Sequence, residues 1–211
     1  AGLPLEHVLG WADFCGQRIA VDPGVFVPRR RTELLVQCAA ALTPPGATVV
    51  DLACGSGAIG AAIAALVDGV TLHAVDIEPA AVRCAQRNLT PLGGRVYLGD
   101  LYDPLPTRLR GQVDLLVANV PYVPSAAVGL LPAEARLHEP LVALDGGPDG
   151  LDLLRRVAAG ARAWLRPGGH LLVETSAEQA AAAADAYAAA GLTPEVVSDD
   201  ELPATVVIGR A

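Results

Sequence analysis

The chain has 211 residues, of which 52% are hydrophobic and 18% charged, and this balance excludes an intrinsically disordered protein. Its formal net charge of -8 repels phosphate backbones, which disfavours stable nucleic-acid binding. No run approaches the roughly 18 apolar residues of a membrane span. Residues 1–10 lack the basic and apolar regions of a signal peptide. We therefore expect a cytoplasmic protein with no membrane partner.

The cysteines and the basic residues suggest no special site. The cysteines are far apart and no histidine stands at a zinc-finger interval from them, so we expect free thiols and no bound metal. They are Cys15, Cys38, Cys54 and Cys84. The basic run Arg29-Arg30-Arg31 is interpreted as the solvated entrance of a helix, because three cations are too few for a nucleic-acid footprint.

Two parts of the chain differ in pattern. Residues 1–30 are expected to form a connector and a β-hairpin, with strands at 14–19 and 25–27 around the turn Asp22-Pro23-Gly24. From residue 31 to residue 211, strand-like runs alternate with helical patterns, which is typical of βαβ units and a largely parallel sheet. The sequence therefore predicts a short appended segment and one α/β domain.

The predicted elements of that domain follow from hydrophobic spacing and from Gly and Pro breaks. Helices are expected at 35–42, at 57–66, from Pro79 with Val82, Ala85 and Leu89 buried, at 151–165 before Pro167-Gly168-Gly169, and at 177–190. Strands are expected at 48–52, 70–75, 96–98, 113–118, 170–174, 195–198 and 205–208. The last two are close enough to pair as an antiparallel edge. We expect a Rossmann-like, mostly parallel seven-stranded sheet with helices on both faces and an antiparallel last strand.

A glycine-rich loop joins the first strand of this domain to its helix. The loop runs from Asp51 to Gly60, and Gly55, Gly57 and Gly60 match the pattern G-x-G-x-x-G. Such glycines let the backbone turn sharply and approach a nucleotide closely. On this pattern alone, a nicotinamide or flavin dinucleotide and S-adenosylmethionine both fit.

Acidic residues end three successive strands beside this loop. Asp51 would repel a pyrophosphate and attract a cationic amino-acid group, which favours S-adenosylmethionine. Asp76 stands where a carboxylate accepts hydrogen bonds from ribose hydroxyls, and Asp100 where one accepts from an adenine amino group. The alternative is that these acids are helix caps or solvated loop residues. Three of them at successive strand ends favour a cofactor site.

The tetrapeptide Asn119-Val120-Pro121-Tyr122 follows the predicted strand 113–118. It resembles the Asn-Pro-Pro-Tyr motif of methyltransferases that alkylate planar nitrogens. The lone pair of such a nitrogen is delocalised, so the enzyme must hold both N–H groups and aim the nitrogen at the methyl carbon. An asparagine oxygen and the next backbone carbonyl accept those hydrogen bonds, and the tyrosine ring forms a wall. The alternative interpretation is a proline turn after a strand.

Over nearly its whole length the sequence resembles the HemK/PrmC family of protein glutamine N5-methyltransferases. Two of the shared segments are particular to that family, namely Pro-Arg-x-x-Thr-Glu at 28–33 and Glu-Pro-x-x-Ala-Leu at 139–144. The others are Val25-Phe26-Val27, the 51–60 loop, Asp76-Ile77 with Pro79, residues 119–122, Gly146-Gly147-Pro148-Asp149-Gly150-Leu151 and Leu165-Arg166-Pro167-Gly168-Gly169.

The resemblance implies an S-adenosylmethionine-dependent methyltransferase that acts on a protein glutamine, in a release factor or a ribosomal protein. It implies that Asn119 and Val120 hold the substrate amide, with Pro121 and Tyr122 completing the catalytic tetrapeptide. The implied cofactor-binding residues are Asp51, Ala53, Gly55, Gly57, Asp76, Ile77, Asp100, Leu101 and Asn119. The residues expected to border the substrate are Phe26, Arg29, Glu139 and Pro140.

The chain departs from the family in two ways. Val120 replaces the usual proline, but Pro121 favours extended geometry at the residue before it, so we expect the carbonyl to keep its direction. The family also has a helical N-terminal domain, and this chain begins near the connector. An adenine-N6 nucleic-acid methyltransferase with a similar tetrapeptide is the main alternative, although the acidic charge counts against it. A nicotinamide oxidoreductase and a non-catalytic cofactor-binding protein are more distant.

Overall fold

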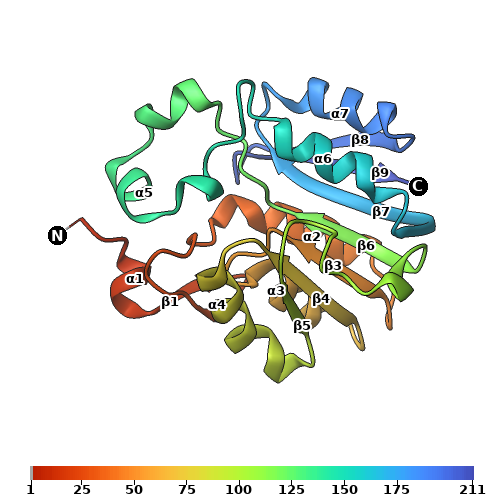
Figure 1. Ribbon diagram of the computed structural model, residues 1–211, viewed down its shortest axis with the longest axis horizontal. Coiled ribbons are helices and arrows are strands. Elements are labelled where there is room, and N and C mark those ends of the chain that lie inside the picture. Colours follow the sequence, from red (N-terminus) through yellow and green to blue (C-terminus); the bar gives the residue numbers. More distant parts are fainter. Residues whose placement is uncertain (1) are drawn as a thin grey trace.

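The computed structural model describes residues 2–211 and contains a seven-stranded sheet in the order β5-β4-β3-β6-β7-β9-β8 (Figure 1). Parallel neighbours are β5 (Arg95–Leu98), β4 (Thr71–Asp76), β3 (Thr48–Leu52), β6 (Val113–Ala118) and β7 (Leu165–Thr175). The last strand, β9 (Ala204–Arg210), is antiparallel to both β7 and β8 (Thr193–Asp199). The mostly parallel, Rossmann-like sheet with an antiparallel last strand is thus confirmed.

Helices cover both faces because successive strand side chains point to opposite sides. Val49 packs on the face covered by α2 (Glu33–Leu42), α3 (Ala58–Leu66) and α4 (Pro79–Leu89). Its neighbour Val50 packs on the other face, against α6 (Asp152–Ala161) and α7 (Ala180–Ala189). In Figure 1, α4 lies beside β4 and β5 at one end of the sheet, and α6 and α7 lie beside β7 and β8 toward the other end.

The boundary between α6 and β7 differs from the prediction. The helix ends at Ala161, and Leu165 begins the strand, which includes Pro167-Gly168-Gly169. The spacing of Leu165 from Ala161 continues the helical period, so the pattern extended the helix too far. The proline and glycines are accommodated because the register against β6 shifts between Val113 and Leu115, and Gly168 has a φ of +78°.

An N-terminal hairpin is present, as expected, but its turn was misplaced. Strands β1 (Trp11–Phe14) and β2 (Gln17–Ala20) pair across Cys15-Gly16, whose φ values of 49° and 71° suit a tight two-residue hairpin turn. The turn at Asp22 is real, with Val25 N donating to Asp22 O, but residues 25–27 form no strand. Pro23-Gly24 was the stronger turn signal and drew the hairpin to the wrong place. The domain boundary at residue 30 stays a prediction.

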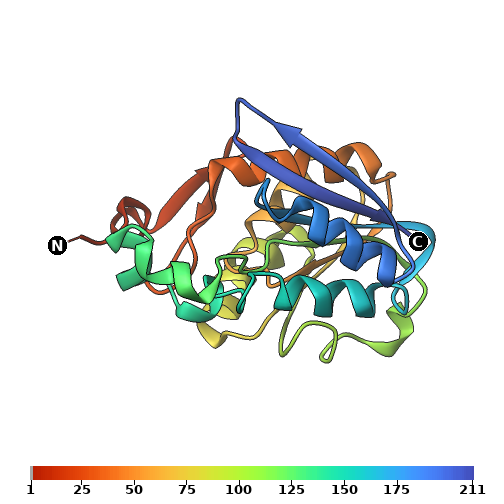
Figure 2. The ribbon, with the colours of Figure 1, turned by 90° about the horizontal axis from the view of Figure 1, so that it is seen from above.

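Two segments lie beyond the carboxyl ends of the parallel strands. One is the N-terminal part with α1 (Leu5–Leu9), and the other is the cap segment, residues 123–151, which holds η4 (Ser125–Leu130), α5 (Ala133–His138) and η5 (Leu141–Ala143). Figures 1 and 2 both place α1 and the cap segment on the same side of the sheet. None of the helices within residues 2–211 is long and apolar enough to cross a membrane.

Candidate functional site

A cavity of about 350 Å³ lies between the carboxyl ends of the strands and the cap segment. Small-molecule sites commonly have volumes of about 300–1,000 Å³. Four parts of the chain line the cavity, namely the glycine-rich loop, the end of β4, the tetrapeptide and the segment that follows the hairpin. The cap segment closes one side. Its walls include Ala53, Cys54, Gly55, Asp76, Ile77, Phe26, Arg29, Arg31, Thr32, Asn119, Val120, Pro121, Tyr122, Leu131 and Pro140.

The glycine-rich loop is held against the end of β4 by Asp76. Gly55 N donates to Asp76 Oδ2 at 2.8 Å, and Glu78 N donates to Asp76 Oδ1 at 2.9 Å. Burial raises the pKa of the Asp76 carboxyl, and these backbone hydrogen bonds oppose the shift. Ala53 has a φ of 52°, a left-handed conformation that non-glycine residues rarely adopt, and Gly55 has a φ of 55°. The loop therefore presents its backbone to the cavity in a fixed, strained shape.

Only the first of the three loop glycines borders the cavity. A Cβ atom on Gly57 would lie 2.9 Å from Leu89, and one on Gly60 would lie 3.1 Å from Leu72. These two glycines let α3 pack closely against α4 and the sheet. The G-x-G-x-x-G pattern thus combines one residue at the cavity with two residues of helix packing.

Several predicted cofactor residues do not line the cavity. Asp51 is fully buried, and its Oδ2 accepts from Gly60 N at 3.0 Å. Asp100 Oδ2 lies 2.6 Å from Arg156 Nη2 on α6, so its carboxylate already forms an ion pair within the protein. Of the nine predicted residues, the structure places Asp51, Gly57, Asp100 and Leu101 outside the lining. Direct contact of these four with a cofactor stays a prediction.

The tetrapeptide begins directly after β6, and all four residues line the cavity. Asn119 Nδ2 donates to Thr32 Oγ1 at 3.2 Å and to Glu174 Oε2 at 3.5 Å. The hydroxyl of Tyr122 donates to Glu174 Oε1 at 3.0 Å. Burial, with a further contribution from Glu174, raises the pKa of Tyr122, so this phenol stays protonated at neutral pH. Sequence reasoning missed Thr32 and Glu174 as site residues, although Thr32 lies in a segment shared with the resembled family.

The segment Gly146-Gly147-Pro148-Asp149-Gly150 supports the tetrapeptide from behind. A Cβ atom on Gly146 would lie 2.6 Å from Pro121 O, and one on Gly150 would collide with Tyr122 O. Gln179 Nε2 donates to Tyr122 O at 2.9 Å and to Asp149 O at 2.8 Å. The glycines of this segment therefore allow its backbone to pack directly against the backbone of the tetrapeptide.

The basic run 29–31 stands at the entrance of α2, as expected, and two of its three residues are also paired with buried carboxylates. Arg29 Nη2 donates to both oxygens of Glu139, whose side chain is fully buried, and its guanidinium lies 4.9 Å from the centre of the Phe26 ring. Arg31 Nε donates to Glu174 Oε1 at 3.0 Å. Buried carboxylates attract these cations because an unpaired buried charge is costly. Arg30 is exposed.

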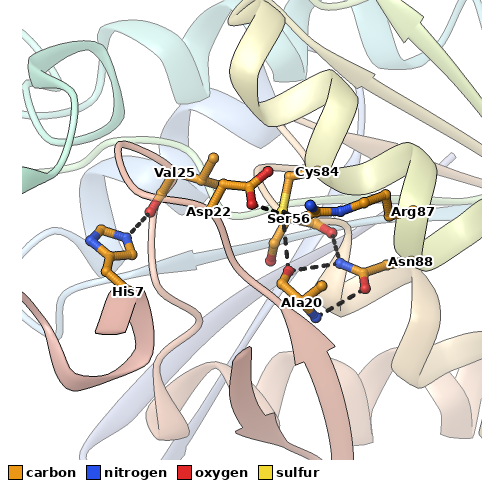
Figure 3. A network of polar contacts seen from close by, with 8 residues as sticks. All are labelled: His7, Ala20, Asp22, Val25, Ser56, Cys84, Arg87 and Asn88. Carbon is orange, nitrogen blue, oxygen red and sulfur yellow. Dashed lines mark hydrogen bonds and ion pairs between the residues drawn. The ribbon is translucent and has the colours of Figure 1, made fainter. Parts of the chain in front are cut away.

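The hairpin is tied to the glycine-rich loop by Asn88 of α4, which sequence reasoning also missed (Figure 3). Asn88 Nδ2 donates to Ala20 O at 2.9 Å and to Ser56 O at 2.8 Å, and its Oδ1 accepts from Ala20 N at 3.0 Å. Nearby, Arg87 pairs with Asp22 at 2.7 Å. These contacts set the position of the segment that carries Phe26 into the cavity wall. Nothing in the spacing of Asn88 along its helix indicates this role.

The cysteines are free thiols, and burial raises the pKa of each. Over residues 2–211, no group of three or more His, Cys, Asp or Glu side chains is arranged to hold a metal ion.

Comparisons with known proteins agree on one family. Residues 16–185 match the model of the methyltransferase small domain. Release factor glutamine methyltransferase from Gloeobacter violaceus is 44% identical over 183 residues, which cover 84% of this chain and 63% of that protein. The protein of the same name from Mycolicibacterium smegmatis is 38% identical over 202 residues, which cover 95% of this chain and 71% of that protein.

The fold has solved counterparts as well. A methyltransferase from Pyrococcus furiosus superposes with a TM-score of 0.68 over 92% of this chain and 89% of that one, at 15% identity. The chain spans less than two thirds of the length of the first curated relatives it matches, at 62% and 63%. The matched residues 16–185 nevertheless include the glycine-rich loop, the tetrapeptide and the parallel strands β3 to β7. The chain belongs to the methyltransferase small domain family and to the family of the release factor glutamine methyltransferases.

Proposed function

We propose that this protein transfers the methyl group of S-adenosylmethionine to the side-chain amide nitrogen of a glutamine in a release factor. The observation that carries the proposal is the orientation of Asn119. Its Nδ2 is turned toward Thr32 and Glu174, which leaves Oδ1 as the end available to an acceptor in the cavity. An amide substrate offers two N–H donors, and an asparagine oxygen is a suitable partner for one of them.

The residues of the cavity fit the cofactor. Asp76, fixed by Gly55 and Glu78, offers its remaining lone pairs to ribose hydroxyls, and Ala53 and Gly55 border the cavity where the amino-acid part would lie. Ile77 is half exposed and gives an apolar surface beside Asp76 for a flat base. When bound, S-adenosylmethionine supplies an electrophilic methyl group on a sulfonium.

The tetrapeptide acts by positioning. Asn119 Oδ1 and the Val120 carbonyl accept from the two N–H groups of the acceptor amide, so the nitrogen lone pair is aimed at the methyl carbon. The ring of Tyr122 is held by its hydroxyl contact to Glu174 and forms a wall beside the planar amide. Phe26 and Arg29, which border the same cavity, and Pro140 of the cap segment are proposed to contact the substrate, whereas Glu139 holds Arg29 in place.

A release factor is the proposed partner because the relatives of this chain are release factor glutamine methyltransferases. A glutamine flanked by glycines enters the cavity without backbone clashes. A duplex adenine would have to be flipped out at a cost of a few kcal/mol, and a protein with a net charge of -8 has little phosphate-contact energy to offset it.

The test offers labelled S-adenosylmethionine and the protein to intact release factors, ribosomal proteins, DNA and RNA in parallel, with mass spectrometry of the modified residue. We expect label on a release-factor glutamine and none with Asn119→Ala, which should bind the cofactor normally but lose about 10²-fold or more in rate. Label on adenine would overturn the proposal. Label only on a glutamine of another protein would keep the chemistry and replace the partner.

A further inference from the structure

We infer that Glu174 is a positioning residue of this methyltransferase and that its carboxylate fixes which end of the Asn119 amide faces the acceptor. The inference rests on the proposed function and deepens it. Neither the family segments nor the spacing of the motifs indicates a role for Glu174, which stands in the sequence as the end of an apolar strand.

Glu174 is next to the last residue of β7 and is 1% exposed. Three donors from different parts of the chain converge on it. Its Oε1 accepts from Tyr122 OH at 3.0 Å and from Arg31 Nε at 3.0 Å, and its Oε2 faces Asn119 Nδ2 at 3.5 Å. The β6–β7 pairing brings these residues together, because Ala118, next to Asn119, is paired with Val173, next to Glu174.

The orientation of the Asn119 amide matters because its two ends are similar in size and opposite in hydrogen bonding. If the amide rotated by half a turn, its NH₂ would face the N–H groups of the substrate and repel them. Thr32 does not prevent this rotation, because a hydroxyl both donates and accepts. An ionised carboxylate only accepts, so Glu174 is compatible with Nδ2 and repels Oδ1.

The remaining contacts explain how a buried carboxylate is tolerated there. The guanidinium of Arg31 pairs with Glu174 and lies 5.6 Å from the centre of the Tyr122 ring. An ionised carboxylate buried without such a partner would be strongly unfavourable. Glu174 thereby fixes the two side chains of the tetrapeptide that face the acceptor, the Asn119 amide and the Tyr122 ring.

The first test is a double-mutant cycle on the methylation rate. Glu174→Gln keeps the shape of the side chain but replaces one acceptor oxygen with a donor. We expect it to lower kcat about tenfold or more, with the dissociation constant for S-adenosylmethionine changed less than about twofold. In the Asn119→Ala background, Glu174→Gln should cost much less than its roughly tenfold loss in the unmodified protein, since Glu174 acts mainly through Asn119 and only the Tyr122 contact remains. Additive losses would overturn the inference.

Two further variants separate orientation from general damage. Glu195→Gln, on the exposed edge strand β8, removes the same charge away from the cavity and should leave kcat unchanged. Thr32→Val removes the other partner of Asn119 Nδ2. Its loss in kcat should be several-fold smaller than that of Glu174→Gln, because a hydroxyl can bond to either end of the amide. A larger loss with Thr32→Val would assign the orienting role to Thr32 and overturn the inference.

A measurement without turnover keeps this inference apart from the proposed function. The side-chain NH₂ of Asn119 is identified in an NMR spectrum by its disappearance in Asn119→Ala, and its hydrogen exchange is measured. We expect exchange at least about tenfold faster in Glu174→Gln than in the unmodified protein and unchanged in Glu195→Gln. Equal exchange rates would overturn the role of Glu174. Failure to methylate any glutamine would overturn the proposed function, and the exchange rates would still decide the contact.

Discussion

The guanidinium of Arg29 donates to both carboxylate oxygens of Glu139, at 2.6 and 2.7 Å, across 110 residues of sequence. Glu139 also accepts from the backbone N–H of Val27 at 3.3 Å. The segments 28–33 and 139–144, on which the family resemblance chiefly rests, are therefore two halves of one structural unit. This unit attaches the cap segment to the wall that carries Phe26.

Glu139→Ala is expected to destabilise the protein, because it leaves Arg29 and the Val27 N–H without a partner. Since Arg29 is partly solvated, the loss should be about 1–3 kcal/mol rather than the larger cost of a fully buried pair. Chemical denaturation measures it. Arg155→Ala, which breaks an exposed pair with Asp149, is the control and should have a smaller effect. Equal losses in the free energy of unfolding would show that the Arg29–Glu139 pair stabilises the protein no more than an exposed ion pair does.

Asp51 should make the stability of the protein fall as pH rises. Burial raises the pKa of this carboxyl from 3.8 to about 7, with Gly60 opposing and Asp76 adding to the shift. Between these two pH values the folded state binds more protons than the unfolded state, so the free energy of unfolding decreases as pH increases. Asp51→Asn removes this pH dependence. The free energy of unfolding of the variant, relative to that of the unmodified protein, should therefore increase by at least about 1 kcal/mol between pH 4 and pH 8. Parallel stability curves would contradict the raised pKa.

Asp76→Ala should weaken S-adenosylmethionine binding by about 1.5–3 kcal/mol, because it removes the proposed charge-assisted hydrogen bonds to the ribose. The same change leaves Gly55 N and Glu78 N without their acceptor and loosens the loop. Calorimetry measures the affinity. Asp100→Ala is the informative comparison, since Asp100 pairs with Arg156 and lies outside the cavity wall. A smaller loss is expected for Asp100→Ala, and an equal loss would support a direct contact of Asp100 with the cofactor.

Gly150→Ala should disturb the tetrapeptide. Gly150 has a φ of +79°, and an added Cβ would collide with Tyr122 O. Gly46→Ala is a matched control, since Gly46 has a φ of +78° but open space around the added atom. Both substitutions carry a strain of about 1 kcal/mol from the left-handed backbone. Only Gly150→Ala should cost clearly more in thermal unfolding and also lower the methylation rate. Equal effects would show that the contact with Tyr122 is not structurally important.

Val120→Pro should be tolerated, with methylation within about threefold of the unmodified protein. The Val120 side chain is 1% exposed and belongs to the core next to the cavity. Proline is smaller than a bulky aliphatic core residue, and Pro121 already favours extended backbone here. Kinetics with a release factor tests this. A collapse of activity would mean that the backbone at 119–120 differs from that of relatives with two prolines.

The sequence by itself determined the elements of the sheet and the location of its chemistry. Apolar runs such as 48–52 and 113–118 were recognised because strand and helix periods depend on residues only a few positions apart. The glycine-rich loop and the tetrapeptide follow such strands, and parallel strands end at the same edge of a sheet, so their proximity was predictable. The local Pro-Gly signal nevertheless misplaced the hairpin turn, because turn propensities do not decide which neighbouring turn pairs the strands.

Only the tertiary structure decided which side chains meet at the site. Glu174 and Asn119 stand 55 residues apart and become neighbours because β6 pairs with β7 in one register. Asp100 faces Arg156 rather than the cavity because α6 packs beside it, and Asn88 joins the hairpin to the loop across 68 and 32 residues. Such contacts depend on strand order, helix packing and burial, which are set by the whole chain and leave no local pattern at either residue.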